Sequence, residues 1–392
     1  MTERNLLVVQ GGGPTQVLNA TLASIVEEAH AQGKFHRIYG ARKGIQGLLK
    51  GGVADLNRLS PADIELLRVS PGAALGSSRA KPSADDLAQL LQFLKQNNVR
   101  DLLFLGGNGT MRGAETVSRF CAERDFSVRV LGGPKTVDND IAMTDRCPGY
   151  ASAARYIAQS TRDLGVDVRS LPQPVSILET MGRSVGWLAA AAAAGKLDEQ
   201  DAPHLVYLPE RAFEMDKFLA ALDRVVAAQG WAIVVVAEGI RDARGRYIYQ
   251  VEDPTQSDPL KRPITGGVAQ FVAEAVARNL KIRCRSEKPG LLGRASMLHA
   301  SEQDRKDAGL VGRAVVRGLL AGETEKMVSL LPLDAQSETG YEFVLLEKVA
   351  ETERPIPAEW IGDGAIPVKE GFFDYLRPLM GELVPYCTAL HQ

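Results

Sequence analysis

The chain has 392 residues, 45% of them hydrophobic and 24% charged, and its formal net charge is −2. This composition is ordinary for a globular protein large enough for two packed units, and the absence of long single-sign charge blocks argues against a general nucleic-acid or membrane surface. No stretch approaches the ~18 apolar residues of a membrane span, and the first residues lack a signal-peptide pattern. We expect a cytoplasmic protein without a nucleic-acid or membrane partner.

Cysteine and histidine spacing gives no sign of a disulfide framework or a zinc site. The four cysteines, Cys121, Cys147, Cys284 and Cys387, form no CxxC pair, and the five histidines show neither HxxxH nor HExxH spacing. We expect free thiols, buried or partly buried, in a reducing compartment. No zinc is expected.

The first 135 residues repeat one pattern: a short apolar run, then glycines, then an amphipathic helix. The predicted strands here are Leu6–Val9, Leu102–Leu105 and Val128–Leu131. Ser83 is the expected N-cap of a helix whose apolar residues, from Leu87 to Leu94, follow helical spacing. Continuous apolar strands that alternate with helices predict a parallel sheet covered on both faces. Ligands of such sheets bind at the carboxyl ends of the strands, where the three glycine loops fall.

After residue 150 the alternation resumes. Val175–Leu178 and Ala232–Ala237 are predicted strands, and the Ala-rich segment Trp187–Ala194 is a predicted helix. Arg241–Arg262 is polar and contains one glycine and two prolines, which predicts a loop. The last 60 residues are less periodic, with prolines that mark turns. The whole pattern predicts an α/β protein.

The three glycine loops are candidate phosphate-binding elements. Glycines let backbone N–H groups approach phosphate oxygens, and a helix that starts there favours negative charge. None of the loops has the Walker GxxxxGK[ST] pattern, and no GxGxxG opens the first helix. Strand-to-helix geometry alone would explain a single loop, whereas three in succession favour a binding site.

The run Pro134–Asp140 (PKTVDND) places two carboxylates, Asp138 and Asp140, just after a strand-end glycine pair. One carboxylate can accept a proton from a hydroxyl while the other holds magnesium, which are the two roles that phosphoryl transfer needs. Lys135 adds a fixed positive charge suited to a polyphosphate. On spacing alone, a solvated turn with ordinary acidic residues explains this run at least as well.

Three arginines and one glutamate are further candidates. Arg79 ends a glycine-serine loop, and Arg183 and Arg294 each follow a glycine. Guanidinium groups suit bidentate phosphate binding, although any single arginine of this chain is more simply a surface residue. Glu238 ends an apolar strand, where an unpaired carboxylate is costly, so it is expected to meet a ligand hydroxyl or a cation.

Together these motifs resemble the phosphofructokinase superfamily, and within it the bacterial type usually associated with inorganic pyrophosphate. The resemblance runs nearly end to end. It is carried by GGGPTQVLNATLAS at 11–24, IYGARKGIQGLL at 38–49, PGAALGSSR at 71–79, GGNGT at 106–110, PKTVDND at 134–140, TDRCPGYASAARYIA at 144–158, MGRSVGW at 181–187, AEGI at 237–240, PGLLGR at 289–294 and GETEKMV at 322–328. PKTxDND together with MGR at this separation is highly specific, whereas GGNGT alone would be weak.

The resemblance implies a phosphotransferase that acts on an alcohol: reversible, magnesium-dependent transfer of a phosphoryl group from pyrophosphate to the 1-hydroxyl of fructose 6-phosphate. Asp138 would be the general base, with Lys135 and Arg79 also catalytic, while Asn108 and Asp140 would hold Mg²⁺. The implied donor-binding residues are Gly12, Arg79, Asn108, Gly109, Thr110 and Lys135. The implied sugar-binding residues are Thr136, Asp138, Asp140, Met181, Gly182, Arg183, Glu238, Arg285 and Arg294, with Glu238 on sugar hydroxyls and Arg294 near the 6-phosphate.

The resemblance also implies a domain arrangement and an oligomer. Two Rossmann-like parallel-sheet domains are expected, with the active site in the cleft between them. Residues 1–149 and about 293–345 would form the phosphoryl-donor domain, and residues 150–292 and about 346–392 the sugar-phosphate domain. Arg285 matches a family arginine that reaches a neighbouring subunit's substrate, with Arg283 as a competitor for that role. A shared site implies a homodimer or homotetramer.

Four residues leave the identity of the phosphoryl donor and of the sugar acceptor open. Gly109 resembles ATP-dependent enzymes, where a missing side chain leaves room for the nucleotide, whereas Lys135 resembles pyrophosphate enzymes. Overall similarity favours pyrophosphate, with an ATP-dependent 6-phosphofructokinase as the alternative. Pro174 stands where a basic residue is common and Gly293 where a glutamine is common, so sedoheptulose 7-phosphate is an alternative acceptor.

Two other classes compete with this reading. The NAD and lipid kinases share a GGxGT loop, but they would leave PKTVDND and MGR unexplained. A non-catalytic regulatory subunit that binds phosphosugars would suit the changes at Pro174 and Gly293, and at Asn108, where the ATP-using branch of the family commonly has aspartate. Four retained residues argue against that alternative: Asp138, Asp140, Lys135 and Arg183.

Overall fold

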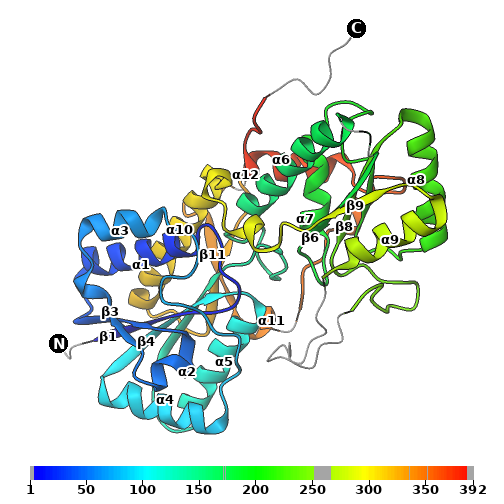
Figure 1. Ribbon diagram of the computed structural model, residues 1–392. Helices are drawn as coiled ribbons and strands as arrows, with labels where there is room; N and C mark the ends of the chain where they lie inside the picture. The colour runs from blue at the N-terminus through cyan, green and yellow to red at the C-terminus, as the bar shows by residue number, and fades with distance from the viewer. Residues whose placement is uncertain are drawn as a thin grey trace. The chain divides into compact units, whose positions relative to one another are not determined.

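The computed structural model describes residues 4–170, 172, 174–250, 266–334, 336–350 and 352–385. Figure 1 shows the path of the chain. The chain forms two compact units, and each unit is made of three separate segments of the sequence. The first unit comprises Met1–Tyr150, Ala295–Ala300 and Asp304–Arg354, and the second comprises Ala151–Arg294, Ser301–Gln303 and Pro355–Gln392.

The first unit is built on a seven-stranded sheet with the order β11-β10-β5-β4-β1-β2-β3. Its strands are β1 (Asn5–Gln10), β2 (Arg37–Ala41), β3 (Val53–Asp55), β4 (Val99–Gly106), β5 (Arg129–Pro134), β10 (Lys326–Leu330) and β11 (Tyr341–Leu345). The central strands are parallel, as predicted, but β3 and β11 pair antiparallel with β2 and β10. The sheet is therefore mixed rather than wholly parallel. Both outer strands follow short connections, whereas a parallel crossover takes about a dozen residues or more.

Alternate side chains of this sheet pack on helices at its two faces. Leu7, Val9 and Phe104 join a core with residues of α4 (Ala84–Gln96) and α5 (Asn108–Ala122). Leu6, Val8 and their neighbours join a second core with α1 (Leu18–Gln32), α3 (Pro61–Arg68) and α10 (Glu302–Ala321). The remaining helices of this unit are α2 (Gly44–Leu49) and α11 (Leu346–Ala350). Burial on both faces explains why these strands are continuous apolar runs.

The second unit contains a four-stranded sheet with the order β7-β8-β6-β9, in which every described pair of strands is parallel. The strands are β6 (Val175–Thr180), β7 (Leu205–Tyr207), β8 (Ala232–Ala237) and β9 (Cys284–Glu287). The helices are α6 (Tyr150–Arg169), α7 (Trp187–Ala191), α8 (Met215–Gln229), α9 (Val268–Leu280) and α12 (Glu370–Met380). The α/β class expected from the sequence is confirmed.

Several local predictions can be compared directly with these elements. Ser83 caps α4, and together with Asp86 it forms a complete capping box. Cys121 and Cys147 are buried free thiols and Cys284 is a partly buried one, whereas Cys387 lies outside the described residues. The predicted loop Arg241–Arg262 lies outside them from residue 251 onward. Among the described helices, none is long and apolar enough to cross a membrane.

Candidate active site

The three glycine loops meet at the carboxyl edge of the first sheet, because β1, β4 and β5 are adjacent there. The N–H of Gly11, just after β1, donates to the carbonyl of Leu105 on β4 at 2.8 Å. The N–H of Lys135, just after β5, donates to the carbonyl of Gly106 at 3.0 Å. Each loop is thus tied to its neighbour by a backbone hydrogen bond, and their residues share one edge.

The loop that carries Arg79 lies beside Gly12. The Gly12 N–H donates to the Ser78 carbonyl at 3.3 Å, and the Ser77 hydroxyl donates to the Gly12 carbonyl. Gly12 has a φ of +74°, and a Cβ built on it would stand 3.2 Å from Nζ of Lys135. Glycine is therefore needed here for both conformation and space. The exposed Arg79 follows directly after this contact.

Lys135 is a buried ammonium at the same edge. Its residue is only 3% exposed, and its Nζ donates to the carbonyl of Gly13. The contact with Gly13 and the proximity to Gly12 place the positive charge against the first glycine loop. A cation held there suits an anion that binds over that loop.

Helix α5 begins at the second glycine loop with Asn108, Gly109 and Thr110 in its first turn. The first N–H groups of a helix lack helical partners, and the helix dipole favours an anion near them. Gly109 is exposed, and a Cβ built on it would meet nothing within 4 Å. Space is therefore open in front of this helix end.

The PKTVDND run is a tight turn held by its own side chains. The N–H of Asp138 donates to Oγ1 of Thr136 at 3.0 Å. Asn139 has a φ of +55°, and its buried Oδ1 accepts from the N–H of Cys147 at 3.0 Å. Asparagine is among the few residues that adopt this conformation readily. The turn fixes the backbone between the two carboxylates, Asp138 and Asp140.

Asp140 is joined to Asn108 across the edge. Nδ2 of Asn108 donates to Oδ2 and to the carbonyl of Asp140, both at 3.2 Å. Oδ1 of Asn108 is buried and has no hydrogen-bond partner among the described residues. Carboxylate and amide oxygens are the ligands that Mg²⁺ and Ca²⁺ prefer. The donor set of Asn108, Asp140 and the nearby Asp138 therefore fits a hard divalent cation.

Glu353 is a carboxylate that the sequence analysis did not identify. It reaches the turn through an antiparallel bridge between Ile141 and Glu353, next to a hydrogen bond from the Arg354 N–H to the Asp140 carbonyl at 2.9 Å. Burial, and then the charges of Asp138 and Glu353, raise the pKa of Asp140 to about 7. A bound cation would offset this repulsion. In the described part of the chain, no three His, Cys, Asp or Glu side chains form a ready metal cluster.

A buried ion pair supports the segment that follows this turn. Arg146 donates from Nε and Nη2 to the two carboxylate oxygens of Asp307 on α10, at 2.7 and 2.9 Å. Asp304, one turn earlier on the same helix, accepts from the N–H of Gly149 at 2.7 Å. The Thr136 N–H donates to the Pro148 carbonyl at 3.2 Å, which links this segment back to PKTVDND. Helix α10 thus helps to position the carboxylate turn.

In the second unit, β6 and β8 bring the MGR turn and Glu238 together. Thr180 pairs with Ala237, and the Glu238 N–H donates to the Thr180 carbonyl at 2.9 Å. A Cβ on Gly239 would lie 1.8 Å from the carbonyl oxygen of Arg183, so the AEG segment packs directly on the MGR turn. Gly182 adopts a φ of +128°, which favours glycine.

The PGLLGR segment lies near the same turn, whereas Arg285 does not. Met181 and Gly293 both line a small recess, together with Glu179. Arg294 directly follows Gly293, at the end of a 3₁₀ turn. Arg285 lies on β9 opposite Ser176, four residues before Thr180, which is ~13 Å along the strand. Arg285 is therefore separated from the other predicted sugar-binding residues of its own unit.

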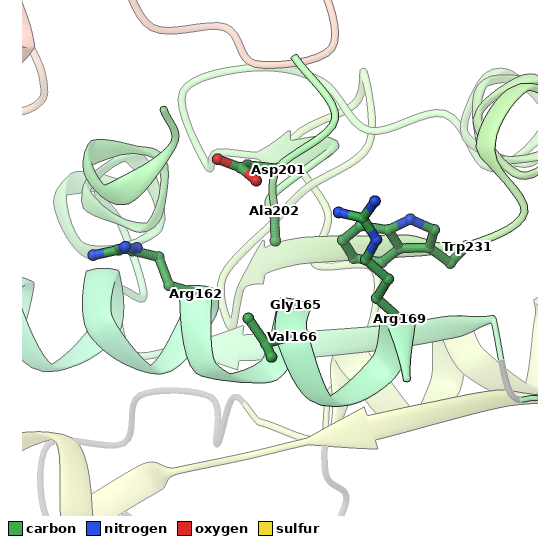
Figure 2. A pocket seen from close by; sticks show the side chains of 7 residues that line it. All are labelled: Arg162, Gly165, Val166, Arg169, Asp201, Ala202 and Trp231. Atoms are coloured by element: carbon green, nitrogen blue, oxygen red, sulfur yellow. The ribbon is translucent and has the colours of Figure 1, made fainter. Parts of the chain in front are cut away.

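A second recess of the second unit contains none of the predicted site residues. Figure 2 shows it on α6, with Gly165 and Val166 at its floor and Arg169 beside Trp231. Arg162, Asp201 and Ala202 complete its lining. It therefore lends no support to the predicted site.

Comparison with known proteins decides the family. The family described as "Phosphofructokinase" matches residues 5–319. The chain belongs to this family. It is similar to a pyrophosphate–fructose 6-phosphate 1-phosphotransferase of Xanthomonas campestris, with 37% identity over 97% of this chain and 92% of that protein. It is also similar to a sulfofructose kinase of Alkalicoccus urumqiensis, with 35% identity over 82% of each chain.

A solved structure supports the same assignment. The crystal structure of a pyrophosphate-dependent phosphofructokinase from Nitrosospira multiformis matches with a TM-score of 0.85 and 31% identity, over 100% of this chain and 95% of that one. The resemblance to the phosphofructokinase family that was based on PKTVDND and MGR is confirmed. The roles of the individual site residues stay predictions.

Proposed function

We propose that this chain transfers a phosphoryl group from pyrophosphate to the 1-hydroxyl of fructose 6-phosphate, giving fructose 1,6-bisphosphate and inorganic phosphate. The observation that carries the proposal is the carboxylate turn beside three phosphate-type loops: Asp138 and Asp140 lie on the same sheet edge as Gly12, Lys135 and the start of α5. Full-length similarity to pyrophosphate-dependent relatives supports the same donor and acceptor.

The proposed reaction divides the work among a few groups. Asp138 accepts the proton of the sugar 1-hydroxyl as its oxygen attacks phosphorus, and the P–O bond to the leaving phosphate breaks. Lys135, Arg79 and the first N–H groups of α5 bind the donor oxygens. Asn108 and Asp140 would hold Mg²⁺, which would supply charge neutralisation at the donor. Catalysis then rests on positioning and charge rather than on covalent attachment to the protein.

On the acceptor side we propose that Thr136, Met181, Gly182, Arg183 and Glu238 bind the sugar, with Glu238 on its hydroxyls. Arg294 binds the 6-phosphate, and Arg285 reaches the substrate of a neighbouring subunit in a homodimer or homotetramer. The position of Arg285 on β9, apart from the MGR turn, is compatible with that role. The first unit would bind the donor and the second the sugar phosphate.

ATP is the second candidate donor, and one observation favours it. The open space in front of Gly109 would accommodate a nucleotide, because no side chain occupies it. The buried ammonium of Lys135 near Gly12 favours pyrophosphate, since it adds charge where a nucleotide would otherwise make contacts.

Initial rates test the proposal directly. The protein is assayed with Mg²⁺, with pyrophosphate or ATP as donor, and with fructose 6-phosphate, sedoheptulose 7-phosphate or sulfofructose as acceptor. We expect turnover with pyrophosphate and fructose 6-phosphate, and reversal with fructose 1,6-bisphosphate and phosphate. A strict requirement for ATP would contradict the donor assignment, and faster turnover of another ketose would contradict the acceptor assignment. Sugar binding without turnover with either donor would indicate a regulatory subunit.

A further inference from the structure

Lys43 is held in an unusual backbone conformation at the carboxyl end of β2. Its φ of +57° and ψ of +37° are left-handed, and it directly precedes α2. Glycine and asparagine adopt this conformation readily, whereas lysine does so rarely. Non-glycine residues in strained conformations cluster at functional sites, where the surrounding structure compensates for the strain. Lys281 and Glu325 share the left-handed φ, so a role for Lys43 has to be inferred from what surrounds it.

The turn at Lys43 is pressed against the loop that carries Arg79. The N–H of Lys43 donates to the carbonyl of Leu75 at 2.7 Å. A Cβ built on Gly44 would stand 2.8 Å from Cβ of Ser78, so the backbones approach closely there. Ser78 in turn accepts from the N–H of Gly12. Lys43, Arg79 and the first glycine loop thus form one continuous surface within the first unit.

The side chain of Lys43 starts against the loop that carries Arg79, whereas that of Arg42 starts against Gly52. Cγ of Lys43 lies 3.1 Å from the position of a Cβ on Gly76, so the first part of the lysine side chain lies against that glycine. Cβ of Arg42 lies 3.2 Å from the position of a Cβ on Gly52, at the other end of α2. The first carbons of these two adjacent, exposed side chains therefore lie against different segments, Gly76 of the Arg79 loop for Lys43 and Gly52 for Arg42.

The strand order indicates which part of a donor Lys43 would meet. The proposed base Asp138 follows β5, and β4, β1 and β2 come next across the sheet. Neighbouring strands are ~4.8 Å apart, so the end of β2 lies roughly 14 Å from the end of β5. An in-line donor has its transferred phosphoryl group facing the acceptor oxygen near Asp138 and its leaving group on the far side. The leaving group would extend toward β1 and β2.

We propose that Lys43 is a further donor-binding residue, which contacts the phosphate of pyrophosphate that is not transferred. This proposal rests on the proposed function and deepens it, because it assigns the leaving phosphate to a subsite formed by Lys43 and Arg79. The Lys43 ammonium and the Arg79 guanidinium repel one another as like charges. An anion bound between them replaces this repulsion with two attractions.

The test compares Lys43→Met with Arg42→Met in the full-length protein. We expect Lys43→Met to raise the KM for pyrophosphate and the calorimetric Kd for Mg²⁺-pyrophosphate about tenfold, the usual effect of one charge-assisted contact. The KM for fructose 6-phosphate should stay within about twofold, because only the donor is contacted. Arg42→Met should match the wild type in all three values, and Lys43→Arg should retain most of the donor affinity.

Lys43→Asn separates the charge from the backbone, because asparagine keeps the left-handed turn without the ammonium. We expect it to lose donor affinity as Lys43→Met does. If Lys43→Asn instead matches the wild type, the residue serves only the turn and the proposal is wrong. If the wild type uses pyrophosphate and every variant has the wild-type KM and Kd for it, the subsite is excluded while the proposed function stands. A wild type that neither binds nor uses pyrophosphate overturns both.

Discussion

Asn108 donates from Nδ2 to Oδ2 of Asp140 at 3.2 Å and leaves its own buried Oδ1 without a hydrogen-bond partner in the described structure. The amide is orientated by its NH₂ group, so its oxygen is free to accept another bond. A buried acceptor left unsatisfied costs about 1–3 kcal/mol. A cation bound to Oδ1 would remove that cost and would also offset the repulsion among the neighbouring carboxylates.

Replacement of Asn108 should therefore alter cation affinity in a direction that depends on charge. Asn108→Asp adds a carboxylate beside Asp140, so we expect a lower Tm without Mg²⁺ and roughly tenfold tighter Mg²⁺ binding. Asn108→Ala removes an oxygen ligand and should weaken Mg²⁺ binding by a similar factor. Calorimetric titration with Mg²⁺ measures both. Equal affinity in the wild type and both variants would exclude Asn108 as a ligand.

Asp138→Asn should abolish the proposed proton transfer while leaving the turn intact. A hydrogen bond runs from the backbone N–H of Asp138 to Oγ1 of Thr136, and the substitution retains this bond. We expect kcat to fall ~10²–10⁴-fold with little change in either KM, because an amide cannot accept the proton. Steady-state kinetics with pyrophosphate and fructose 6-phosphate measure kcat and both KM values. A variant with near-wild-type kcat would show that another group is the base.

The Arg146–Asp307 pair should be important for stability, because both charges are buried. Arg146→Met removes the guanidinium that both oxygens of the buried Asp307 carboxylate contact, and the expected loss is about 3–5 kcal/mol in the free energy of unfolding. The double variant with Asp307→Leu should recover part of that loss. Lys217→Met, which breaks the exposed pair with Glu214, should change stability by less than ~1 kcal/mol. Urea unfolding compares all four proteins, and equal losses in the two single variants would contradict the argument.

His204 should make the second unit sensitive to acid. Its Nδ1 accepts from the Ile233 N–H at 2.9 Å and its Nε2 lies 3.2 Å from the Gln200 carbonyl, an arrangement that requires the neutral ring. Burial lowers the pKa of His204 from 6.5 to about 4. Because the folded pKa lies below the unfolded one, the unfolded chain binds more protons between pH 6.5 and 4. The contribution of neutral His204 to stability is fully present above pH 6.5 and is lost as the pH falls toward 4.

We expect this histidine to contribute about 2 kcal/mol of the difference in unfolding free energy between pH 7.5 and pH 5. His204→Asn, which retains an acceptor for the Ile233 N–H, should lose most of that dependence. His36→Asn, at an exposed position, should keep it. Urea unfolding at the two pH values measures the difference, and the same slope in His204→Asn and the wild type would rule out the assignment.

The sequence predicted those elements whose burial is uniform along the element. Ala232–Ala237 was predicted with the bounds that β8 has, because all six residues are buried. The prediction did not include β9 or β11, whose residues are largely exposed or half-buried and show no clear periodicity. It also missed α12, where Pro378 argues against a helix although Phe372 and Leu376 face the core. Tertiary packing overrides local preference at such positions.

The candidate site was predictable where its residues are close together in sequence. The glycine loops, PKTVDND and MGR are short motifs that can each be recognised in a single sequence. Glu353 and the Arg146–Asp307 pair carry none, because their partners are far away along the chain and only the sheet order brings them together. The strained turn at Lys43 was equally hidden, because lysine, unlike glycine or asparagine, gives no sign of a left-handed φ in a sequence.

The position of β10 in the first sheet has a consequence for synthesis on the ribosome. This strand pairs with β5, yet about 190 residues separate Pro134 from Lys326 in the chain. At ~5–20 residues per second, the outer edge of β5 waits roughly 10–40 s for its partner. An unpaired strand edge can pair with another chain during that time. Nascent chains of this protein should therefore be most prone to pair with one another through the edge of β5 until residue 330 has emerged.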